Sequence, residues 1–238
     1  MNLLLLEQTD LIADSHAILK PGDARFQHIV SILGSQPGEH LRAGLLNGPM
    51  GSARIDELSA NQITLALKLD QPPPAKLPLT IILALPRPKM IRRVLRTVAE
   101  MGVSELILLN TYKVEKSFWH SPALSDAAVQ GYFKDGLQQA RDTVLPSLRM
   151  ARLFKPFVED ELPGIARGKR SLVAHPGQHP SCPIALNQPC VLAIGPEGGF
   201  IDYEIQKLQE AGFECVQMGE RILRVETALT SLIARLYC

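Results

Sequence analysis

The chain has 238 residues, of which 46% are hydrophobic and 21% charged, and its formal net charge is +1. This composition excludes a wholly disordered chain and predicts one large domain or two small ones. The apolar runs are far shorter than the ~18 residues of a membrane helix. The apolar start at residues 1–6 lacks the basic segment and cleavage site of a signal peptide, so no targeting segment is expected.

The first 71 residues predict a small β module that contains one helix. Helically spaced apolar residues indicate a helix over residues 23–33, which Gly34 can terminate. Turn-forming residues separate three short segments with strand character, at 41–46, 52–58 and 62–69. We expect a barrel-like β domain that needs a packing partner, because about 70 residues give only a marginal core.

A proline-rich stretch at residues 71–78 marks the predicted domain boundary, because proline neither continues a helix nor donates to a β ladder. The predicted domains are therefore residues 1–71 and 72–238. After the boundary, strand and helix signals alternate, which is typical of a mostly parallel sheet covered by helices. The expected strands are 79–85, 105–109, 171–174, 190–194 and 213–217. The expected helices are 89–101, 126–141 and 202–211, with Asp126 and Asp202 as N-caps, and a last helix from Glu226.

Positive charge concentrates between residues 71 and 160, where 13 basic and 8 acidic residues give a net charge of +5. The densest cluster of basic residues begins at Arg87 and continues on one face of the predicted helix 89–101. We call the four basic residues of that face the basic strip: Lys89, Arg92, Arg93 and Arg96. A row of cations without neighbouring anions favours a phosphate ligand such as RNA, although a solvated helix face has the same pattern.

Two loops follow predicted strands in the last third of the chain. The glycine loop, residues 194–200, reads Ile-Gly-Pro-Glu-Gly-Gly-Phe, and the arginine loop, residues 218–227, contains Arg221 and Arg224. Glycines permit close backbone approach to a ligand, and ligands bind beyond the carboxyl ends of parallel strands. Neither G-x-G-x-x-G nor a phosphate loop is present, so dinucleotide and ATP sites lose their main support.

The four cysteines do not form a C-x-x-C pair, which predicts reduced thiols and a cytoplasmic protein: Cys182, Cys190, Cys215 and Cys238. Cys215 lies in an apolar strand and is expected in the core. His175 and His179 stand near Cys182, but no fourth ligand is close, so no metal site is expected. Trp119 is expected to pack inside the protein.

The two loops resemble those of the SPOUT methyltransferases, in particular the RsmE family, which methylates N3 of a uridine in 16S ribosomal RNA. The residues that carry the resemblance are the glycine loop and the string Gly-Glu-Arg-Ile-Leu-Arg-Val-Glu-Thr-Ala-Leu at 219–229, with weaker support from 88–103. The resemblance implies a PUA-like RNA-binding N-terminal domain and a C-terminal α/β domain with a deep trefoil knot. It also implies a homodimer formed through the C-terminal domain.

S-adenosylmethionine is the cofactor that this resemblance implies. The residues implied to bind it are Val173, Ala174, His175, Pro176, Gly195, Glu197, Gly198, Gly199, Met218, Gly219, Ile222, Leu223 and Arg224. For methyl transfer, we assign Arg224 to charge stabilisation and Glu226 to accepting a proton or orienting Arg224. Glu226 can equally be structural, because a carboxylate in a first helical turn complements the helix dipole.

The expected partner is 16S ribosomal RNA, and the assembled small subunit is favoured because a small domain with net charge −3 reads little sequence alone. The predicted RNA-binding residues are Arg87, Lys89, Arg92, Arg93, Arg96 and Arg141. Two departures from the family pattern, Gln138-Gln139 and Leu33-Gly34, affect regions expected to face RNA. Two alternatives stay open: a SPOUT enzyme acting on another RNA, and a scaffold that binds RNA without catalysis.

Overall fold

The structure is a computed structural model that describes residues 2–237. It divides into two compact units, Met1–Ala75 with Lys134–Leu145, and Lys76–Phe133 with Pro146–Cys238. The first division falls at the proline-rich stretch, but Lys134–Leu145 joins the first unit although the sequence analysis assigns it to the second domain. The assignment of residues 1–71 as a PUA-like RNA-binding domain stays a prediction.

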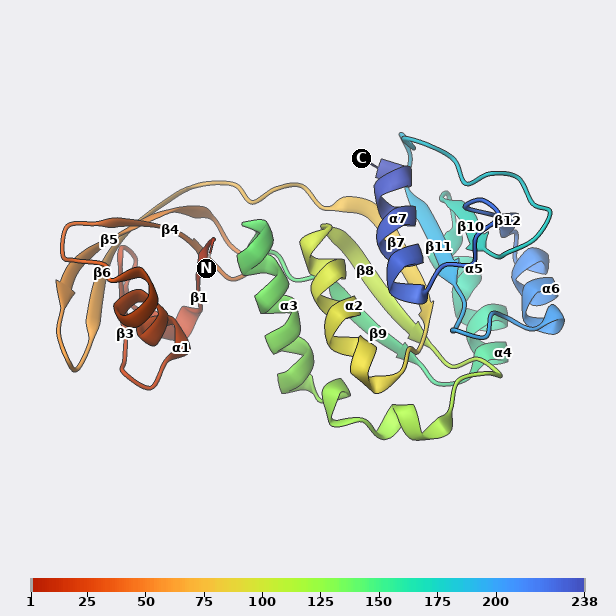
Figure 1. Ribbon diagram of the computed structural model, residues 1–238. Helices are drawn as coiled ribbons and strands as arrows, with labels where there is room; N and C mark the ends of the chain where they lie inside the picture. Colours follow the sequence, from red (N-terminus) through yellow and green to blue (C-terminus); the bar gives the residue numbers. More distant parts are fainter. Residues whose placement is uncertain (1, 238) are drawn as a thin grey trace. The chain divides into compact units, whose positions relative to one another are not determined.

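The first unit is a curled, half-barrel sheet with the strand order β1-β4-β5-β6-β3-β2 (Figure 1). Its strands are β1 (Leu4–Leu6), β2 (Leu11–Ala13), β3 (His16–Leu19), β4 (His40–Leu45), β5 (Met50–Leu58) and β6 (Ile63–Gln71). The three longer strands confirm the prediction. The three short ones were missed because three or four residues do not establish an alternating pattern. Inward-facing side chains such as Ile55 and Leu65 form the core of this unit.

The predicted helix over residues 23–33 is confirmed, with a change of winding that the sequence did not predict. It consists of α1 (Ala24–Gln27) and a π-helical turn, η2 (His28–Leu33). The Asp23 carboxylate caps its start by accepting the backbone N–H of Arg25 at 2.7 Å. Gly34 ends it in the left-handed conformation, with φ of +62°.

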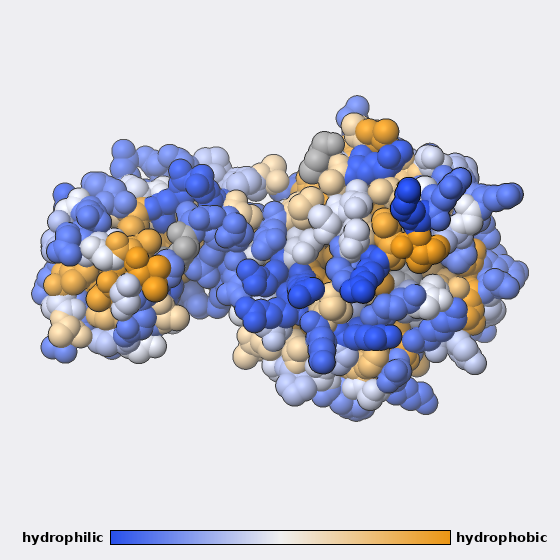
Figure 2. Space-filling view, in the orientation of Figure 1, coloured by the Kyte–Doolittle hydropathy of each residue, from blue (hydrophilic) through white to orange (hydrophobic). Residues whose placement is uncertain are grey.

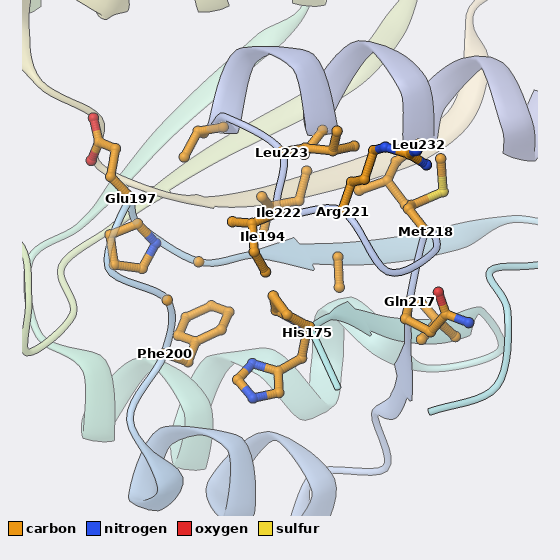
Figure 3. Close-up of a pocket in the computed structure, with 18 of the residues that line it drawn as sticks. His175, Ile194, Glu197, Phe200, Gln217, Met218, Arg221, Ile222, Leu223 and Leu232 are labelled. Atoms are coloured by element: carbon orange, nitrogen blue, oxygen red, sulfur yellow. The ribbon is translucent and has the colours of Figure 1, made fainter. Parts of the chain in front are cut away.

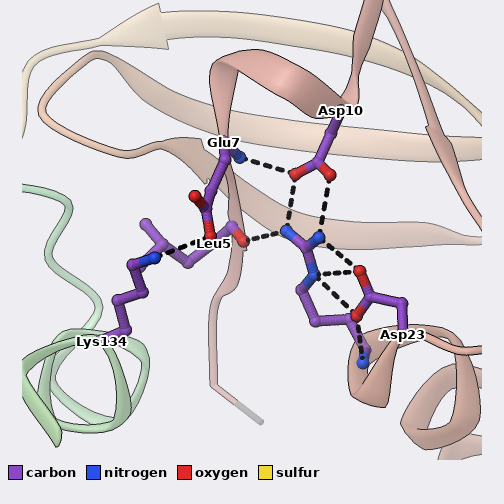
Figure 4. A network of polar contacts seen from close by, with 6 residues as sticks. Leu5, Glu7, Asp10, Asp23 and Lys134 are labelled. Carbon is purple, nitrogen blue, oxygen red and sulfur yellow. Dashed lines mark hydrogen bonds and ion pairs between the residues drawn. The ribbon is translucent and has the colours of Figure 1, made fainter. Parts of the chain in front are cut away.

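A network around Arg25 joins α1 to the first strand, as Figure 4 shows. The guanidinium donates to Asp10 Oδ2 at 2.6 Å, to Asp23 Oδ2 at 2.5 Å and to the carbonyl oxygen of Leu5 at 2.8 Å. Close by, Lys134 Nζ donates to Glu7 Oε1 at 2.8 Å. Hydrogen bonds from Arg25 lower the pKa of Asp23 below its ordinary value.

The second unit is built on a six-stranded sheet in which every pairing is parallel, with the order β12-β10-β11-β7-β8-β9. The strands are β7 (Leu77–Ala84), β8 (Val103–Leu109), β9 (Ser147–Ala151), β10 (Arg170–Ala174), β11 (Cys190–Ile194) and β12 (Glu214–Val216). This sheet confirms the predicted α/β class. The edge strand β9, whose residues are exposed or partly buried, was not predicted.

Helices cover both faces of this sheet (Figure 1). On one face, α2 (Pro88–Glu100) packs against α7 (Val225–Tyr237). On the other lie α6 (Asp202–Glu210) and a helical stretch made of α4 (Phe154–Pro156), η5 (Phe157–Glu161) and α5 (Leu162–Ala166), which was not predicted. The remaining long helix is α3 (Asp126–Ala140). None of the helices within residues 2–237 has both the length and the apolar character needed to cross a lipid bilayer.

The start of α6 differs in detail from the prediction. Asp202 is the first helical residue rather than the cap, and Ile201 takes the cap position. The carboxylate of Glu204 accepts the backbone N–H of Ile201 at 3.1 Å, so the capping role belongs to a residue inside the helix. Asp126 likewise begins α3, and Ser125 Oγ accepts the N–H of Ala128 at 3.4 Å.

The segment that joins β10 to β11, residues 175–189, forms hydrogen bonds with residues near the C-terminus. The N–H of Cys182 donates to the carbonyl oxygen of Gln217 at 2.9 Å, and Leu186 N–H donates to the carbonyl oxygen of Leu236 at 2.6 Å. Residues 175–189 therefore contact both the end of β12 and the end of α7. The chain between those two ends runs from the edge strand β12 to α7, which packs against α2. The knot is what the resemblance implies.

Candidate active site

A cavity opens where three neighbouring parallel strands end. β12, β10 and β11 stop at Val216, Ala174 and Ile194, and all three residues line the cavity. The cavity has a volume of about 110 Å³ and is partly open to solvent. Its location fits the rule that ligands bind at the carboxyl ends of parallel strands.

The glycine loop, the arginine loop and the end of β10 meet around this cavity (Figure 3). The predicted cofactor residues that line it are Ala174, His175, Pro176, Gly195, Glu197, Gly199, Met218, Gly219, Ile222 and Leu223. Further residues line the cavity that the sequence did not predict, namely Ile194, Pro196, Phe200, Val216, Gln217, Arg221, Val225, Ala228 and Leu232. Most of these flank predicted residues, and the last three form the apolar stripe of α7 that faces the cavity.

Three predicted cofactor residues lie outside the cavity lining. Val173 is fully buried among core side chains of the sheet. The carbonyl oxygen of Gly198 faces the loop after β8, where it accepts a hydrogen bond from Lys113 Nζ at 2.5 Å. Arg224 is exposed in the arginine loop, directly before α7. Val173 faces the core rather than the cavity because successive residues of a strand point to opposite sides of the sheet.

The glycine loop is compact, and its geometry depends on Gly195. A Cβ at this position would lie 3.0 Å from the backbone nitrogen of Phe200 and 3.1 Å from its ring. Gly199 has φ of +71°, a conformation that other residues rarely adopt. In Figure 3 the Glu197 side chain points away from the centre of the cavity, and its carboxylate lies 3.6 Å from Arg87 Nε.

The arginine loop forms the opposite wall of the cavity. Gly219 has φ of +104°, and its N–H donates to the side-chain oxygen of Gln217. Ile222 is 76% exposed, which is unusual for a large aliphatic side chain beside a pocket. Met218 and Arg221 lie together at one end of the cavity in Figure 3. The wall thus combines apolar side chains with accessible backbone groups.

His175 is a polar residue directly after β10. Burial lowers its pKa, and the neighbouring His179 adds to this effect. Its Nδ1 atom is buried and has no hydrogen-bond partner within residues 2–237. A buried polar atom without a partner is uncommon, and a bound ligand can satisfy it. The cavity therefore fits a small molecule with both apolar and polar parts.

A buried carboxylate connects the glycine loop to the loop after β8. Glu204 is 2% exposed, and its Oε1 accepts the backbone N–H of Tyr112 at 2.7 Å while Oε2 accepts that of Ile201. The neighbouring Lys113 donates a hydrogen bond to the carbonyl oxygen of Gly198. The Glu204–Tyr112 and Lys113–Gly198 hydrogen bonds therefore both connect these two regions. The sequence analysis did not identify Glu204, because nothing in its helical spacing distinguishes it from a surface residue.

Glu226 lies in a second hollow, between α2 and α7, rather than in the cavity. The same hollow is lined by Arg93 and Arg96 of the basic strip and by Glu100. Burial of Ile91 and Val94 confirms that the opposite face of α2 is the core-facing one. Figure 2 shows hydrophilic side chains gathered over α2 and beside α7. The last predicted RNA-binding residue, Arg141, belongs to the first unit.

The remaining reactive side chains serve the core. Burial raises the pKa of the Cys190 thiol to about 12 and also raises the pKa of Cys182 and Cys215, so none is a thiolate at neutral pH. Cys215 is buried, as predicted, and Cys238 lies outside the described residues. In the described part of the chain no three metal-ligating side chains cluster. Trp119 is buried as predicted and donates from Nε1 to Asn110 at 2.8 Å.

Comparisons with known proteins identify the group to which this architecture is similar. A family model described as an RNA methyltransferase domain matches residues 73–237. A ribosomal RNA small subunit methyltransferase E from Treponema pallidum is 32% identical, and the match covers 98% of this chain and 90% of that protein. A protein of the same name from Synechocystis is 25% identical, with 90% and 70% covered. The crystal structure of a ribosomal RNA small subunit methyltransferase E from Neisseria gonorrhoeae, bound to S-adenosyl methionine, has a TM-score of 0.74 at 20% identity and covers 98% of this chain and 95% of that one.

Proposed function

This chain belongs to the RNA methyltransferase family, and we propose that it transfers a methyl group from S-adenosylmethionine to N3 of a uridine in small-subunit ribosomal RNA. The observation that carries the proposal is the cavity at the ends of β12, β10 and β11, where the glycine loop and the arginine loop meet. The names of the relatives support ribosomal RNA of the small subunit as substrate. Uridine N3 as the acceptor rests on the resemblance of the two loops.

The cavity offers the groups that S-adenosylmethionine needs. Apolar side chains such as Leu223 and Leu232 suit its adenine ring, and the unpartnered Nδ1 of His175 suits one of its polar groups. The glycines bring backbone N–H and C=O groups close to the ligand. When bound, this cofactor supplies a methyl group already activated on a sulfonium sulfur. The protein then needs mainly to align donor and acceptor.

We assign the chemistry of the acceptor to Arg224 and Glu226. Uracil N3 carries a proton that must leave, and negative charge develops on the neighbouring oxygens. The exposed guanidinium of Arg224 is available to stabilise that charge, because it has no ion pair within residues 2–237. The half-buried Glu226, two residues further along the chain, accepts the proton or orients Arg224. Both belong to the arginine loop, whose residues 218–223 line the cavity except for Glu220.

The RNA face in this proposal includes the basic strip on α2. Lys89, Arg92 and Arg93 are exposed, and Arg96 is half-buried. Arg93 and Arg96 line the same hollow as Glu226, so phosphate-binding groups and the proposed proton acceptor share one surface. Phosphate contacts of this kind position an RNA strand without reading its sequence. We further propose a homodimer formed through the second unit, and the cytoplasm as the location of the enzyme.

The experiment that tests this function incubates the purified protein with methyl-labelled S-adenosylmethionine and small ribosomal subunits. We expect label in the RNA as 3-methyluridine, identified after digestion to nucleosides. Label in another nucleoside would assign the chain to a different acceptor. S-adenosylmethionine binding without any transfer to ribosomal RNA would support another RNA substrate, and absence of binding would support the scaffold alternative.

Glu226→Gln tests the assignment of the proton acceptor. We expect a fall in kcat of about 10²–10⁴-fold, the range typical of lost acid–base catalysis, with unchanged affinity for S-adenosylmethionine. Glu100→Gln is the matched control, because Glu100 lines the same hollow and loses the same charge. Normal turnover of a folded Glu226→Gln variant would show that Glu226 is structural.

A further inference from the structure

A groove in the first unit is lined by two arginines from distant parts of the sequence. Arg42 lies on β4, and Arg141 directly follows α3. The groove is also lined by Gln71, the three consecutive prolines 72–74, Met50 and Gly51; it has a volume of about 360 Å³ and is partly open to solvent. Among residues 2–237, no carboxylate lines it. Because proline fixes its own backbone, the proline wall is stiff.

Neither arginine in the groove has an acidic partner within the part of the chain that the structure describes. Other arginines of the same unit do have such partners. Arg25 is paired with Asp10 and Asp23, and Arg54 is paired with Asp56 at 2.8 Å. Two guanidinium groups at one unneutralised groove create a positive potential that favours an anion.

The backbone at Arg141 is held in an unusual conformation. Its φ is +59°, in the left-handed region that non-glycine residues seldom adopt. Such a conformation persists only where surrounding structure enforces it, and it is concentrated at binding and catalytic sites. An ordinary helix end would place glycine or asparagine here, as Gly34 illustrates at the end of η2.

The segment after Arg141 is anchored to the turn between β4 and β5. Thr143 Oγ1 donates to the carbonyl oxygen of Gly48 at 2.6 Å, and the carbonyl oxygen of Thr143 accepts the N–H of Asn47 at 2.8 Å. Leu145 N–H donates to the side-chain oxygen of Asn47 at 2.9 Å. Gly44 makes room, because a Cβ there would overlap the Thr143 methyl group. These contacts fix the position of the backbone directly after Arg141 and so hold Arg141 near β4, the strand that carries Arg42.

We propose that this groove binds a backbone phosphate of the substrate RNA through Arg42 and Arg141. Guanidinium groups match phosphate oxygens in geometry as well as charge, and the Gln71 amide adds a further donor. The first unit then holds the RNA strand while the second carries the methyl-transfer cavity. This inference rests on the proposed function for the identity of the RNA, and it adds Arg42 to the predicted contact at Arg141.

The test measures binding of a small-subunit ribosomal RNA fragment to the full-length protein over a series of salt concentrations. The variants are Arg42→Gln, Arg141→Gly and the double variant. Glycine suits the φ of +59°, so Arg141→Gly removes the side chain without adding strain. Arg54→Gln is the matched control, because Arg54 lies on the same sheet, loses the same charge and is outside the groove.

We expect each single variant to bind the RNA about tenfold more weakly, in line with the loss of one charge-assisted contact. The plot of log affinity against log salt should become shallower by about 0.7 for each arginine. Affinity for S-adenosylmethionine should not change. A double variant that matches Arg54→Gln in both affinity and salt dependence would overturn the proposal.

Two further outcomes separate this inference from the proposed function. If the double variant methylates ribosomal RNA with an unchanged KM for the RNA, the groove proposal fails and the proposed function stands. If the protein binds RNA through the groove but methylates no uridine, the proposed function fails and the groove proposal stands. Saturable binding of uridine monophosphate by the groove, without any effect of the variants on RNA affinity, would assign the groove to a free nucleotide and also overturn the proposal.

Discussion

Gly195 shows how a single residue sets the shape of the cofactor cavity. Gly195→Ala introduces a Cβ that must move the backbone of Phe200, since the nearest backbone atom is only 3.0 Å away. We expect affinity for S-adenosylmethionine to fall by at least tenfold, about 1.4 kcal/mol, in titration calorimetry. Gly131→Ala, on α3 with open space around it, is the control and should raise stability by up to ~1 kcal/mol. Equal cofactor affinity for both variants would contradict this account of the loop.

Arg25 provides a residue-scale prediction for stability. Arg25→Met leaves the carboxylates of Asp10 and Asp23 without their partner, so the free energy of unfolding should fall by about 3 kcal/mol at neutral pH. Because the pKa of Asp23 is lowered in the folded protein, this stabilisation is present above the unfolded value of about 3.9. It is lost as the pH falls further. Denaturant titrations should therefore show the difference between the two proteins narrowing below about pH 4, and a constant difference would contradict the assignment.

The residues of the cavity could be predicted in part from the sequence. Gly195 and Gly199 stand in a loop whose composition already indicated ligand contact, and both line the cavity. Val173 was predicted to bind the cofactor together with the residues that follow it, but the alternation of side chains along the strand directs the Val173 side chain into the core. Ala228 and Leu232 could not be predicted, because the side of α7 that faces the arginine loop depends on how the chain returns from β12.

At the scale of elements, Glu204 links two loops that approach the cavity region from different strands. Glu204→Gln replaces a carboxylate that accepts two backbone N–H groups by an amide with a single acceptor oxygen. One buried N–H then lacks a partner, and we expect a loss of stability of about 2 kcal/mol. Hydrogen exchange at Tyr112 and Ile201 should become faster. The exposed Glu210, on the same helix, is the control, and equal effects of Glu204→Gln and Glu210→Gln would contradict this role.

The basic strip on α2 is proposed to contact the phosphates of the RNA. Neutralising Arg92, Arg93 and Arg96 to glutamine should weaken RNA binding and make its log–log salt dependence shallower by about 2. Affinity for S-adenosylmethionine should not change. A matched control neutralises three cations that lie outside the strip, namely Arg54, Arg149 and Lys207. If both triple variants show the same salt dependence, the strip is a solvated helix face.

The long elements were predictable and the short ones were not. The apolar stripe of α2 and the buried run of β11 are strong local signals, and both elements lie where expected. β1 has three residues, and its place beside β4 depends on a contact between distant parts of the chain. The helical stretch at 154–166 contains prolines and a π-helical turn, which obscure its periodicity.

At the scale of the whole molecule, local patterns predict the alternation of strands and helices but not how the chain crosses itself. The knot came from the resemblance of the loops, and the contacts of residues 175–189 with the ends of β12 and α7 are consistent with it. The membership of Lys134–Leu145 in the first unit had no local signal, because these residues continue an ordinary helix pattern and then an irregular segment.

We propose that the chain methylates N3 of a uridine in small-subunit ribosomal RNA. The most direct test is nucleoside mass spectrometry of that RNA from cells of the source organism with and without this protein. We expect 3-methyluridine to be absent from the RNA of cells that lack the protein, to return when the unchanged protein is restored, and not to return when Glu226→Gln is restored. An unchanged level of 3-methyluridine in cells that lack the protein would contradict the claim.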